Sequence, residues 1–400
     1  MIRPGETQTL GRTLISPPER SGGIGVCYGA QGRFRVSLIG HRLDVWACPY
    51  MSQDKRVLAC ATAAIWMATV SLAGKVEGSR VYSTAEITQM ANGLHRGFGP
   101  RVGQAGLSVD QMERAFVEMG FDPLVLGSAN PERLRNLLFA YCDGGLPPVL
   151  VVKIKGKGLH AMTVIGRVDA PGRVRSTRSK RPVLPGSLPG DIVLHDDQQG
   201  LYLAAEIRGG WRQQTRIVPR QPGLKEGLLQ TVLVPVPFRI MADLDGVHAR
   251  LDDLIPKIVK YALEADPRLT ILGRPMVARP VVVRSRDFKE QLTSRPDMAN
   301  SLRTHYRQLP MPRYVWLVEL ACADQNLSFG PTASASCVFG ELLFDTTMPD
   351  ADHMTPLAAH VLGVVAGQAV EGHNSQNWAY LIPDDHMYAP FHPPAMIRSE

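Results

Sequence analysis

The sequence predicts an α+β protein, and three observations lead to that class. Helical patterns fill residues 60–142, and short apolar runs typical of strands follow from residue 148 onward. Helices that precede strands, instead of alternating with them, favour an antiparallel sheet packed on a helical layer. The chain has 400 residues, 44% hydrophobic and 20% charged, which suits two folded domains and excludes a mainly disordered chain.

Four helices are expected in the first half of the chain. The first begins at Cys60 and ends at Gly74, and its many Ala and Met residues favour a helix. Ser108 is a suitable N-cap, and Pro131 suits the first position of a helix. The predicted helices are 60–74, a helix that starts at Thr84, Ser108–Gly120 and Asn130–Cys142.

Strands are expected on both sides of these helices. Residues 1–50 are rich in Gly, and their short apolar alternations at 34–38 and 43–46 indicate an arm of strands or loops. After the helices, four apolar runs predict neighbouring antiparallel strands. These runs are Pro148–Ile154, His160–Val168, Asp191–Leu194 and Leu201–Ile207.

A basic stretch separates the second of these runs from the third. Arg167–Arg181 contains six basic residues and no aromatic residue. We interpret this stretch as a solvated hairpin tip, because nucleic-acid grooves combine basic side chains with aromatic ones that stack on bases. Contact with nucleic acid through Arg173–Arg181 is the alternative, and nucleic acid is not the favoured partner.

The second half predicts a separate α+β domain. Residues 245–263 are amphipathic and predict a helix that Pro256 kinks. Buried strands are predicted at 279–284, 313–321 and 337–344. The resulting organisation is an N-terminal arm at 1–44, a first domain at 45–210, a connector at 211–235 and a second domain at 236–400.

Charge, cysteines and hydropathy narrow the classes of function. The net charge of +7 is mild for a chain of this length and does not by itself indicate a polyanionic partner. The six cysteines form no C-x-x-C pair, which excludes zinc ribbons and thioredoxin-like motifs and predicts free thiols in a reducing compartment. No apolar run approaches 18 residues and the start has no apolar leader, so we expect a cytoplasmic protein without a membrane role.

Metal or cofactor binding is not expected from the sequence. Asp/His pairs occur at 350–354 and 384–386, but no second group with matching spacing accompanies them. Isolated pairs of this kind are more typical of loops than of metal centres. We therefore predict no metal and no cofactor.

Cys60 is the candidate nucleophile. It stands where a polar segment becomes a helix, and the free N–H groups and the dipole of a helix N-terminus stabilise a thiolate. Gln53 lies seven residues earlier, where a folded-back loop brings its amide beside the sulfur as an oxyanion donor. The remaining cysteines are interpreted as packing residues.

His160 and a following carboxylate complete the candidate site. His160 opens a strand after a Gly-rich turn, and a carboxylate at the end of the next strand would orient the imidazole and fix its tautomer. Asp196 and Asp197 both stand there. Because adjacent strand residues face opposite sides, we expect only one of them to meet His160, and we favour Asp196. His195 is expected on the surface.

Three segments together resemble a known family. The strings CPYMSQDKRVLACATAAIWMA, LHAMTVIG and IVLHDDQQGLYLAAE resemble the papain-like cysteine peptidase superfamily, in particular the bacterial branch related to bacteriocin-processing double-glycine peptidases. That branch has a Gln shortly before a Cys that opens a helix, a His that starts an apolar strand, and an Asp that ends the next strand before a Gly turn. The resemblance covers residues 45–207.

The resemblance implies a papain-like fold for the first domain and a role for each candidate. It implies Cys60 as nucleophile and His160 as general base and acid. It implies Asp196 as the group that orients His160, and Gln53 as an oxyanion donor.

The chain departs from the family pattern at two positions. Cys60-Ala61 stands where the family has Cys-Gly, and Asp196-Asp197 stands where it has Asp-Pro. The transporter and ATPase domains that accompany the processing peptidases do not occur in these 400 residues. Only the chemical machinery of the branch therefore carries over.

The leading hypothesis is a papain-like cysteine hydrolase, a peptidase, that acts on a protein or peptide substrate. The second domain would recognise this substrate or a partner protein. The alternative hypothesis is a catalytically inactive papain-like fold that serves as a protein-binding or regulatory module.

Overall fold

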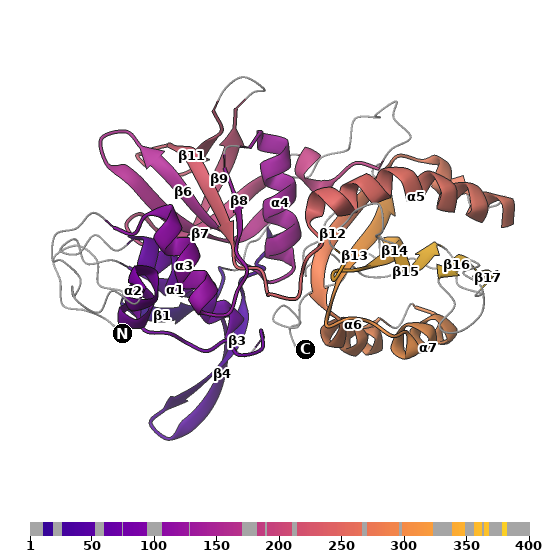
Figure 1. Ribbon diagram of the computed structural model, residues 1–400, viewed down its shortest axis with the longest axis horizontal. Coiled ribbons are helices and arrows are strands. Elements are labelled where there is room, and N and C mark those ends of the chain that lie inside the picture. Colours follow the sequence, from indigo (N-terminus) through magenta and orange to yellow (C-terminus); the bar gives the residue numbers. More distant parts are fainter. Residues whose placement is uncertain are drawn as a thin grey trace. The chain divides into compact units, whose positions relative to one another are not determined.

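Helices and sheets together make up the protein, whose structure is a computed structural model (Figure 1). The structure describes residues 11–18, 26–52, 60–73, 75–93, 106–127, 129–169, 182–188, 190–209, 214–265, 270–295, 298–322, 338–348, 356–361, 364–367 and 378–381. Those within Met1–Val168 and Gly190–Phe238 form one compact unit, and those within Asp169–Pro189 and Arg239–Pro394 form a second. Within these ranges, none of the helices combines the length and the hydrophobicity that crossing a bilayer requires.

The four helices predicted for the first unit are confirmed. They are α1 (Cys60–Leu72), α2 (Thr84–Asn92), α3 (Val109–Glu118) and α4 (Pro131–Asp143). The Ser108 hydroxyl caps α3 by accepting a hydrogen bond from the Gln111 N–H, and Asn130 caps α4 in the same way. Each cap satisfies an N–H group that has no partner inside its helix.

The main sheet of the first unit contains the strands that follow these helices. Its described strands have the order β10-β9-β8-β7-β6-β11-β5, with β2 paired to β7. They are β2 (Val26–Cys27), β5 (Leu124–Leu126), β6 (Val149–Ile154), β7 (Gly158–Asp169), β8 (Gly190–Asp196), β9 (Gly200–Arg208), β10 (Arg216–Pro219) and β11 (Gly227–Val234). The strands β6 to β9 confirm the four predicted from residues 148–207.

Two predictions about this unit are wrong. Residues 211–235 do not form a connector, because β10 and β11 belong to the main sheet and β11 lies between β6 and β5. Arg167 is not part of a solvated tip: it is buried within β7, and its Nε lies 3.1 Å from Asp143 Oδ1 of α4. Residues 170–181, where the alternative nucleic-acid contact falls, are outside the described residues.

α1 is the central helix of the first unit. Every residue of α1 after Cys60 is buried, so the helix packs on all sides. The Thr163 hydroxyl on β7 donates a hydrogen bond to the Ala64 carbonyl at 3.0 Å and ties the beginning of α1 to the sheet. Cys60 itself is partly exposed, which leaves the first residue of a buried helix accessible.

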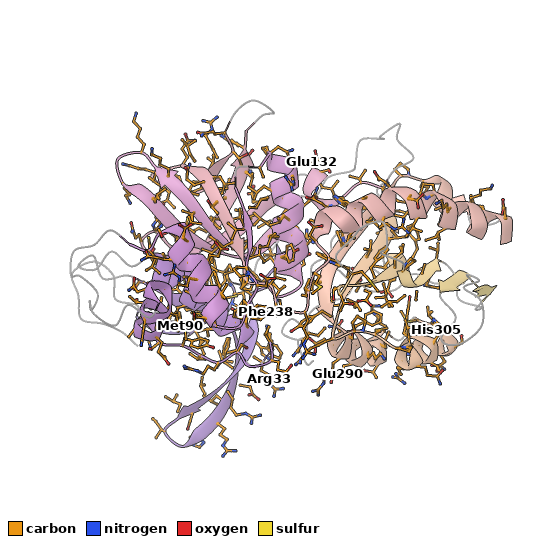
Figure 2. All side chains as sticks on the ribbon, in the orientation of Figure 1. Arg33, Met90, Glu132, Phe238, Glu290 and His305 are labelled. Atoms are coloured by element: carbon orange, nitrogen blue, oxygen red, sulfur yellow. The ribbon has the colours of Figure 1, made fainter. Side chains whose placement is uncertain are left out.

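A smaller sheet of the first unit contains the predicted N-terminal arm. It has the order β1-β4-β3, formed by β1 (Arg12–Ile15), β3 (Gly32–Leu38) and β4 (His41–Met51). Arg33, labelled in Figure 2, pairs with Asp44 across the β3–β4 hairpin at 2.5 Å. Because β4 continues past residue 44 into buried residues up to Met51, the arm and the first domain share this strand.

The second unit is an antiparallel sheet with helices on both faces (Figure 1). Its neighbouring strands, in chain order, are β12 (Met276–Arg284), β13 (Tyr314–Cys322), β14 (Val338–Asp345), β15 (Pro356–Val361), β16 (Val364–Gly367) and β17 (Trp378–Leu381). Its helices are α5 (Leu244–Ala265), α6 (Ser285–Gln291) and α7 (Asn300–Gln308), and short 3-10 turns lie at Pro185–Ser187, Thr270–Gly273 and Leu292–Ser294.

Packing explains why this unit has a helix layer on each side. Phe288 of α6 and Leu302 of α7 join the apolar cluster on one face of the sheet. Trp316 of β13 belongs to the other face, where its Nε1 donates to the Ala242 carbonyl just before α5. The predicted helix with an internal Pro256 and the predicted buried strands are confirmed here.

Candidate active site

Cys60 differs from the other described cysteines in its surroundings. Cys27, Cys48, Cys142 and Cys322 are buried, whereas Cys60 is partly exposed at the beginning of α1. Burial raises the pKa of Cys48 to about 12 and raises that of Cys142 well above its ordinary value. Those two thiols stay protonated, so Cys60 is the thiol placed for reaction.

His160 lies on β7, the strand whose Thr163 is hydrogen-bonded to α1, and stands opposite Val152 of β6. It is the third residue of β7 and does not open the strand as predicted, because the strand already begins at Gly158. Its side chain is buried with 4% exposure. Met162 and Val164, which share its face of the strand, are buried as well. The imidazole is thus held in the protein interior.

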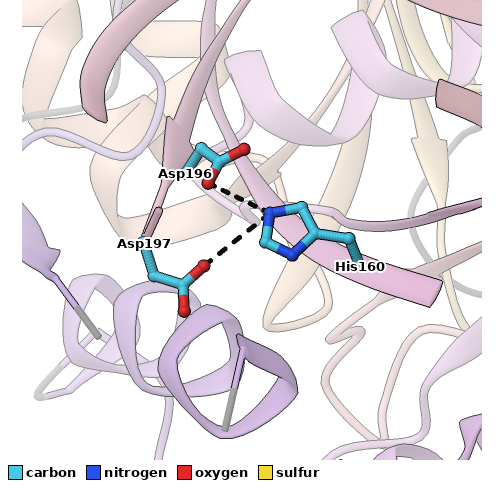
Figure 3. A group of neighbouring side chains, drawn as sticks. All are labelled: His160, Asp196 and Asp197. Carbon is cyan, nitrogen blue, oxygen red and sulfur yellow. Dashed lines mark ion pairs between the residues drawn. The ribbon is translucent and has the colours of Figure 1, made fainter. Parts of the chain in front are cut away.

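Two carboxylates face this imidazole, although we expected only one. His160 Nε2 lies 3.0 Å from Asp196 Oδ1 and 3.7 Å from Asp197 Oδ1 (Figure 3). The pairing of β8 with β9 shifts register between Leu194 and Asp196, and β8 ends at Asp196. The regular alternation of side chains therefore stops before Asp197, and both carboxylates point to the same side.

The charged neighbours of His160 outweigh its burial. Burial lowers the pKa of the imidazole, but the contacts with Asp196 and with the Cys60 side chain raise it, to about 10 overall. Both side chains therefore stabilise the protonated form of the imidazole. Conversely, burial opposes the charge of Asp196, but His160 and backbone N–H groups lower the pKa of this carboxyl.

Asp196 is oriented by the turn that follows it. Its Oδ1 accepts hydrogen bonds from the backbone N–H groups of Gln198 at 2.8 Å and Gln199 at 2.9 Å. Its Oδ2 accepts a third from Gln199 Nε2 at 2.9 Å. We did not predict a role for Gln199. The string DDQQG, which places amides directly after a strand-end carboxylate, was the available signal.

Asp197 has a different environment. It is fully buried, and neither of its side-chain oxygens has a hydrogen-bond partner among the described residues. Burial raises the pKa of this carboxyl to about 7; the His160 charge opposes that rise, and the Asp196 charge adds to it. Asp196 is therefore fixed by hydrogen bonds, whereas Asp197 has none from its side chain among the described residues.

His195 is a structural residue of the interior, and our prediction that it lies on the surface is wrong. Its Nδ1 lies 2.9 Å from the Pro49 carbonyl, and its ring makes edge-to-face contacts with Tyr50 and Tyr202. Burial lowers its pKa to about 4, so the ring is neutral. β8 is an interior strand of the main sheet, and its residues from Ile192 to Asp196 are buried on both faces.

Gln53, the fourth predicted site residue, lies outside the residues that the structure describes. Gln53 falls in residues 53–59, which the structure does not describe, so its role as an oxyanion donor stays a prediction. The Asp/His pairs at 350–354 and 384–386 are also outside the described residues. Within the described chain, His160, Asp196 and Asp197 are a group whose ligand atoms lie within 4.8 Å of one another, as a metal ion requires.

Comparison with known proteins adds no assignment to this geometry. No model of a known protein family matches the chain, and no curated protein matches it. The function must therefore be inferred from the site itself.

Proposed function

We propose that this protein is a papain-like cysteine hydrolase that cleaves amide bonds in a protein or peptide substrate. The observation that carries the proposal is the position of His160. Asp196 Oδ1 lies 3.0 Å from its Nε2, and the Cys60 side chain is among the groups that raise the pKa of this imidazole. A thiol, an imidazole and an orienting carboxylate in this arrangement are the parts of a Cys-His-Asp triad.

The two ring nitrogens of His160 have separate tasks in this proposal. Nε2 faces the carboxylates, so Nδ1, which points away from them in Figure 3, is the nitrogen left for the Cys60 thiol. Asp196 is fixed by three hydrogen bonds, and its Oδ1, 3.0 Å from Nε2, favours the tautomer with the proton on that nitrogen. Nδ1 is then free to accept the proton of the thiol. Asp196 is thus a positioning residue.

The reaction follows from these positions. The Cys60 thiol transfers its proton to His160 Nδ1, and the thiolate attacks the amide carbonyl to form a tetrahedral oxyanion. The Cys60 backbone N–H, and Gln53 as the family resemblance implies, stabilise that oxyanion. His160 returns the proton to the leaving amine, which leaves an acyl group on the sulfur. His160 then deprotonates water, which hydrolyses the thioester and restores the thiol.

The surroundings of the site suit this chemistry. The imidazole is nearly inaccessible at 4% exposure, while the thiol is partly exposed, so a substrate reaches the sulfur without solvating the base. The described cysteines are free thiols, which suits the cytoplasmic location that forms part of this proposal. We assign substrate or partner recognition to the second unit.

A peptide library and an electrophilic peptide test the proposal together. We expect the wild type to cleave members of the library and to form a covalent adduct with a peptidyl vinyl sulfone at Cys60, located by mass spectrometry. Cys60→Ala should abolish both, and His160→Ala should abolish cleavage. Cys27→Ala and Cys142→Ala are the matched controls, since both remove buried thiols and should leave the adduct intact.

Two outcomes would overturn the proposal. Adduct formation that persists in Cys60→Ala would place the reactive thiol elsewhere. A folded wild type that cleaves no peptide and forms no adduct would favour the alternative function, a papain-like binding module. The departures at Ala61 and Asp197 from the family pattern are the observation behind that alternative.

A further inference from the structure

We propose that His160, Asp196 and Asp197 form a binding site for a divalent transition-metal ion, with Zn²⁺ as the best-matched ion of that class. The site lies on the Nε2 side of the imidazole, so the ion and the Cys60 thiol contact different ring nitrogens. Metal binding itself does not depend on the proposed hydrolase function. The inhibition described below rests on that function.

The distances between the three side chains fit a metal site. His160 Nε2 lies 3.0 Å from an oxygen of Asp196 and 3.7 Å from an oxygen of Asp197. Ligand atoms of a tetrahedral zinc ion are about 3.3 Å apart when its bonds are about 2.0–2.1 Å long. The two measured distances bracket that value, and all three ligand atoms lie within 4.8 Å of one another. Imidazole and carboxylate are both common ligands of Zn²⁺.

The environment of Asp197 is an independent observation that points to a cation. Its side chain is fully buried, and neither oxygen has a hydrogen-bond partner among the described residues. A buried carboxylate without a hydrogen-bond partner is unfavourable by several kcal/mol, so such a group in a folded protein requires an explanation. A divalent ion between the two carboxylates would remove that unfavourable term, because it supplies the positive charge and the missing ligand bond.

The residues around Asp196 resemble the outer shell of a metal site. Two backbone N–H groups and the Gln199 side chain fix both oxygens of Asp196. Ligating carboxylates in metal sites are oriented by hydrogen bonds of this kind, which raise the affinity for the ion. His160 is restrained as well, since it lies within β7 and is buried. Two of the three ligands are therefore already in place.

Metal binding at Nε2 would switch off the proposed triad. The ion replaces the proton on Nε2, and the one remaining ring proton is then held on Nδ1, which faces the thiol. With Nδ1 already protonated, His160 has no nitrogen left to accept the proton of Cys60 or of water. We therefore expect Zn²⁺ to inhibit the hydrolase reversibly, with a chelator restoring activity.

Equilibrium dialysis of the full chain with Zn²⁺ tests the site without any assay of activity. We expect the wild type to bind one equivalent with micromolar or tighter affinity. Asp197→Asn should weaken that affinity at least about tenfold, because it replaces an anionic ligand with a neutral amide. Asp191→Asn is the matched control on β8, the strand that leads into Asp197. Asp191 pairs with Arg220 at 2.8 Å, so this variant should leave the affinity for Zn²⁺ unchanged. Circular dichroism checks that each variant is folded.

Two measurements distinguish this site from metal binding by the Cys60 thiol: the Zn²⁺ affinity of Cys60→Ala and the absorption spectrum of the Co²⁺-loaded wild type. We expect Cys60→Ala to retain the wild-type affinity for Zn²⁺. We also expect the Co²⁺-loaded wild type to lack the thiolate-to-cobalt charge-transfer band that a sulfur ligand produces. Loss of binding in Cys60→Ala, or the presence of that band, would overturn the proposal.

The remaining outcomes are equally decisive. Absence of one-equivalent binding by the wild type, or unchanged affinity in both Asp197→Asn and His160→Ala, would also overturn it. If Asp197→Asn does not fold, the affinity of His160→Ala for Zn²⁺ alone decides whether the proposed metal site is correct. Should Zn²⁺ bind as expected while the protein cleaves no peptide, the metal site stands and the proposed hydrolase function fails.

Discussion

Each of the two units buries a cluster of charged side chains, but the clusters differ in kind. In the first unit, the His160 imidazole faces two carboxylates. In the second unit, Arg279, Glu319, Glu341 and His360 occupy opposite positions on the four neighbouring strands β12 to β15. All four are buried. The first cluster is centred on an imidazole, and the second is built around a permanent cation with the His360 imidazole at its end.

Arginine makes the second cluster suited to stability. Arg279 Nη1 lies 2.7 Å from Glu319 Oε2. Arg295, just before α7, lies 3.3 Å from Glu319 and 2.5 Å from Glu341. Guanidinium groups do not release a proton in proteins, so these pairs keep their charges during any reaction. We therefore assign the row to the stability of the second unit.

The first cluster is suited to chemistry for the opposite reason. His160 is an imidazole, a group that can exchange a proton, and the Cys60 side chain is among the groups that raise its pKa. Asp197 adds a buried carboxylate with no hydrogen-bond partner among the described residues. The comparison teaches that the amount of buried charge does not locate the candidate site. Nor does an unsatisfied group, since an oxygen of Glu341 also has no hydrogen-bond partner among the described residues; what distinguishes the first cluster is an imidazole on which a partly exposed thiol acts.

The largest expected effect is on the second cluster. Arg295→Ala removes the cation that contacts both Glu319 and Glu341 and leaves two buried carboxylates with one arginine. Breaking a buried pair in this way destabilises a protein by about 3–5 kcal/mol. Urea denaturation followed by the fluorescence of the five tryptophans, one of which is Trp316 of β13, measures the free energy of unfolding. A loss below about 1 kcal/mol would contradict the structural role of the row.

A pH effect of intermediate size is expected at the end of the same row. His360 is buried beside Glu341 and near His305 of α7, labelled in Figure 2. Burial, together with the His305 charge, lowers the pKa of His360 to about 3. The unfolded chain binds a proton below its ordinary pKa of about 6.5, whereas the folded chain does not until about pH 3. Stability is therefore full above pH 6.5 and falls as the pH decreases.

Comparison with His360→Gln isolates this contribution. Between pH 7 and pH 4.5 the wild type should lose about 2–3 kcal/mol more than the variant, because the variant has no group to protonate at that position. Unfolding free energies from urea titrations at several pH values provide the measurement. Parallel pH dependence in the two proteins would show that His360 does not remain neutral in the folded state.

A smaller effect of opposite sign is expected in the first cluster. Asp197→Asn removes a buried carboxylate that has no hydrogen-bond partner among the described residues. In metal-free buffer we expect the variant to be more stable than the wild type by about 1–2 kcal/mol, because it no longer buries an ionisable group without a hydrogen-bond partner among the described residues. Added Zn²⁺ should reverse this order, since it stabilises the protein that binds it. Thermal unfolding with EDTA and with Zn²⁺ tests both statements, and a destabilised variant in EDTA would contradict the first.

Much of the first unit was predictable because its signals are local. Ser108 and Asn130 mark helix starts by their side chains alone, and both cap the expected helices. Cys60 and His160 stand at the predicted kinds of position, near the beginning of a helix and of a strand. Such features depend on a few neighbouring residues, so a single sequence contains the information.

The wrong predictions concern features that depend on distant partners. Asp197 reaches His160 because the β8–β9 pairing shifts register, and His195 is buried because β8 is an interior strand. The strand β11 is inserted beside β6, although its sequence neighbours suggested a connector. The row that joins Arg279 to His360 spans four strands. Strand order and register arise from tertiary packing, which residue periodicity does not contain.

The most direct test of the central claim is the rate at which iodoacetamide alkylates Cys60 at pH 6 in the presence of EDTA, in the wild type and in His160→Ala. A thiol with an ordinary pKa of about 8.5 is less than about 1% ionised at that pH. If His160 and Cys60 form a thiolate–imidazolium pair, the wild type should react at least about tenfold faster than the variant. The two rates should converge near pH 9.5, where both thiols are largely ionised, which shows equal access to the sulfur. Equal rates at pH 6 in two folded proteins would contradict the proposed triad.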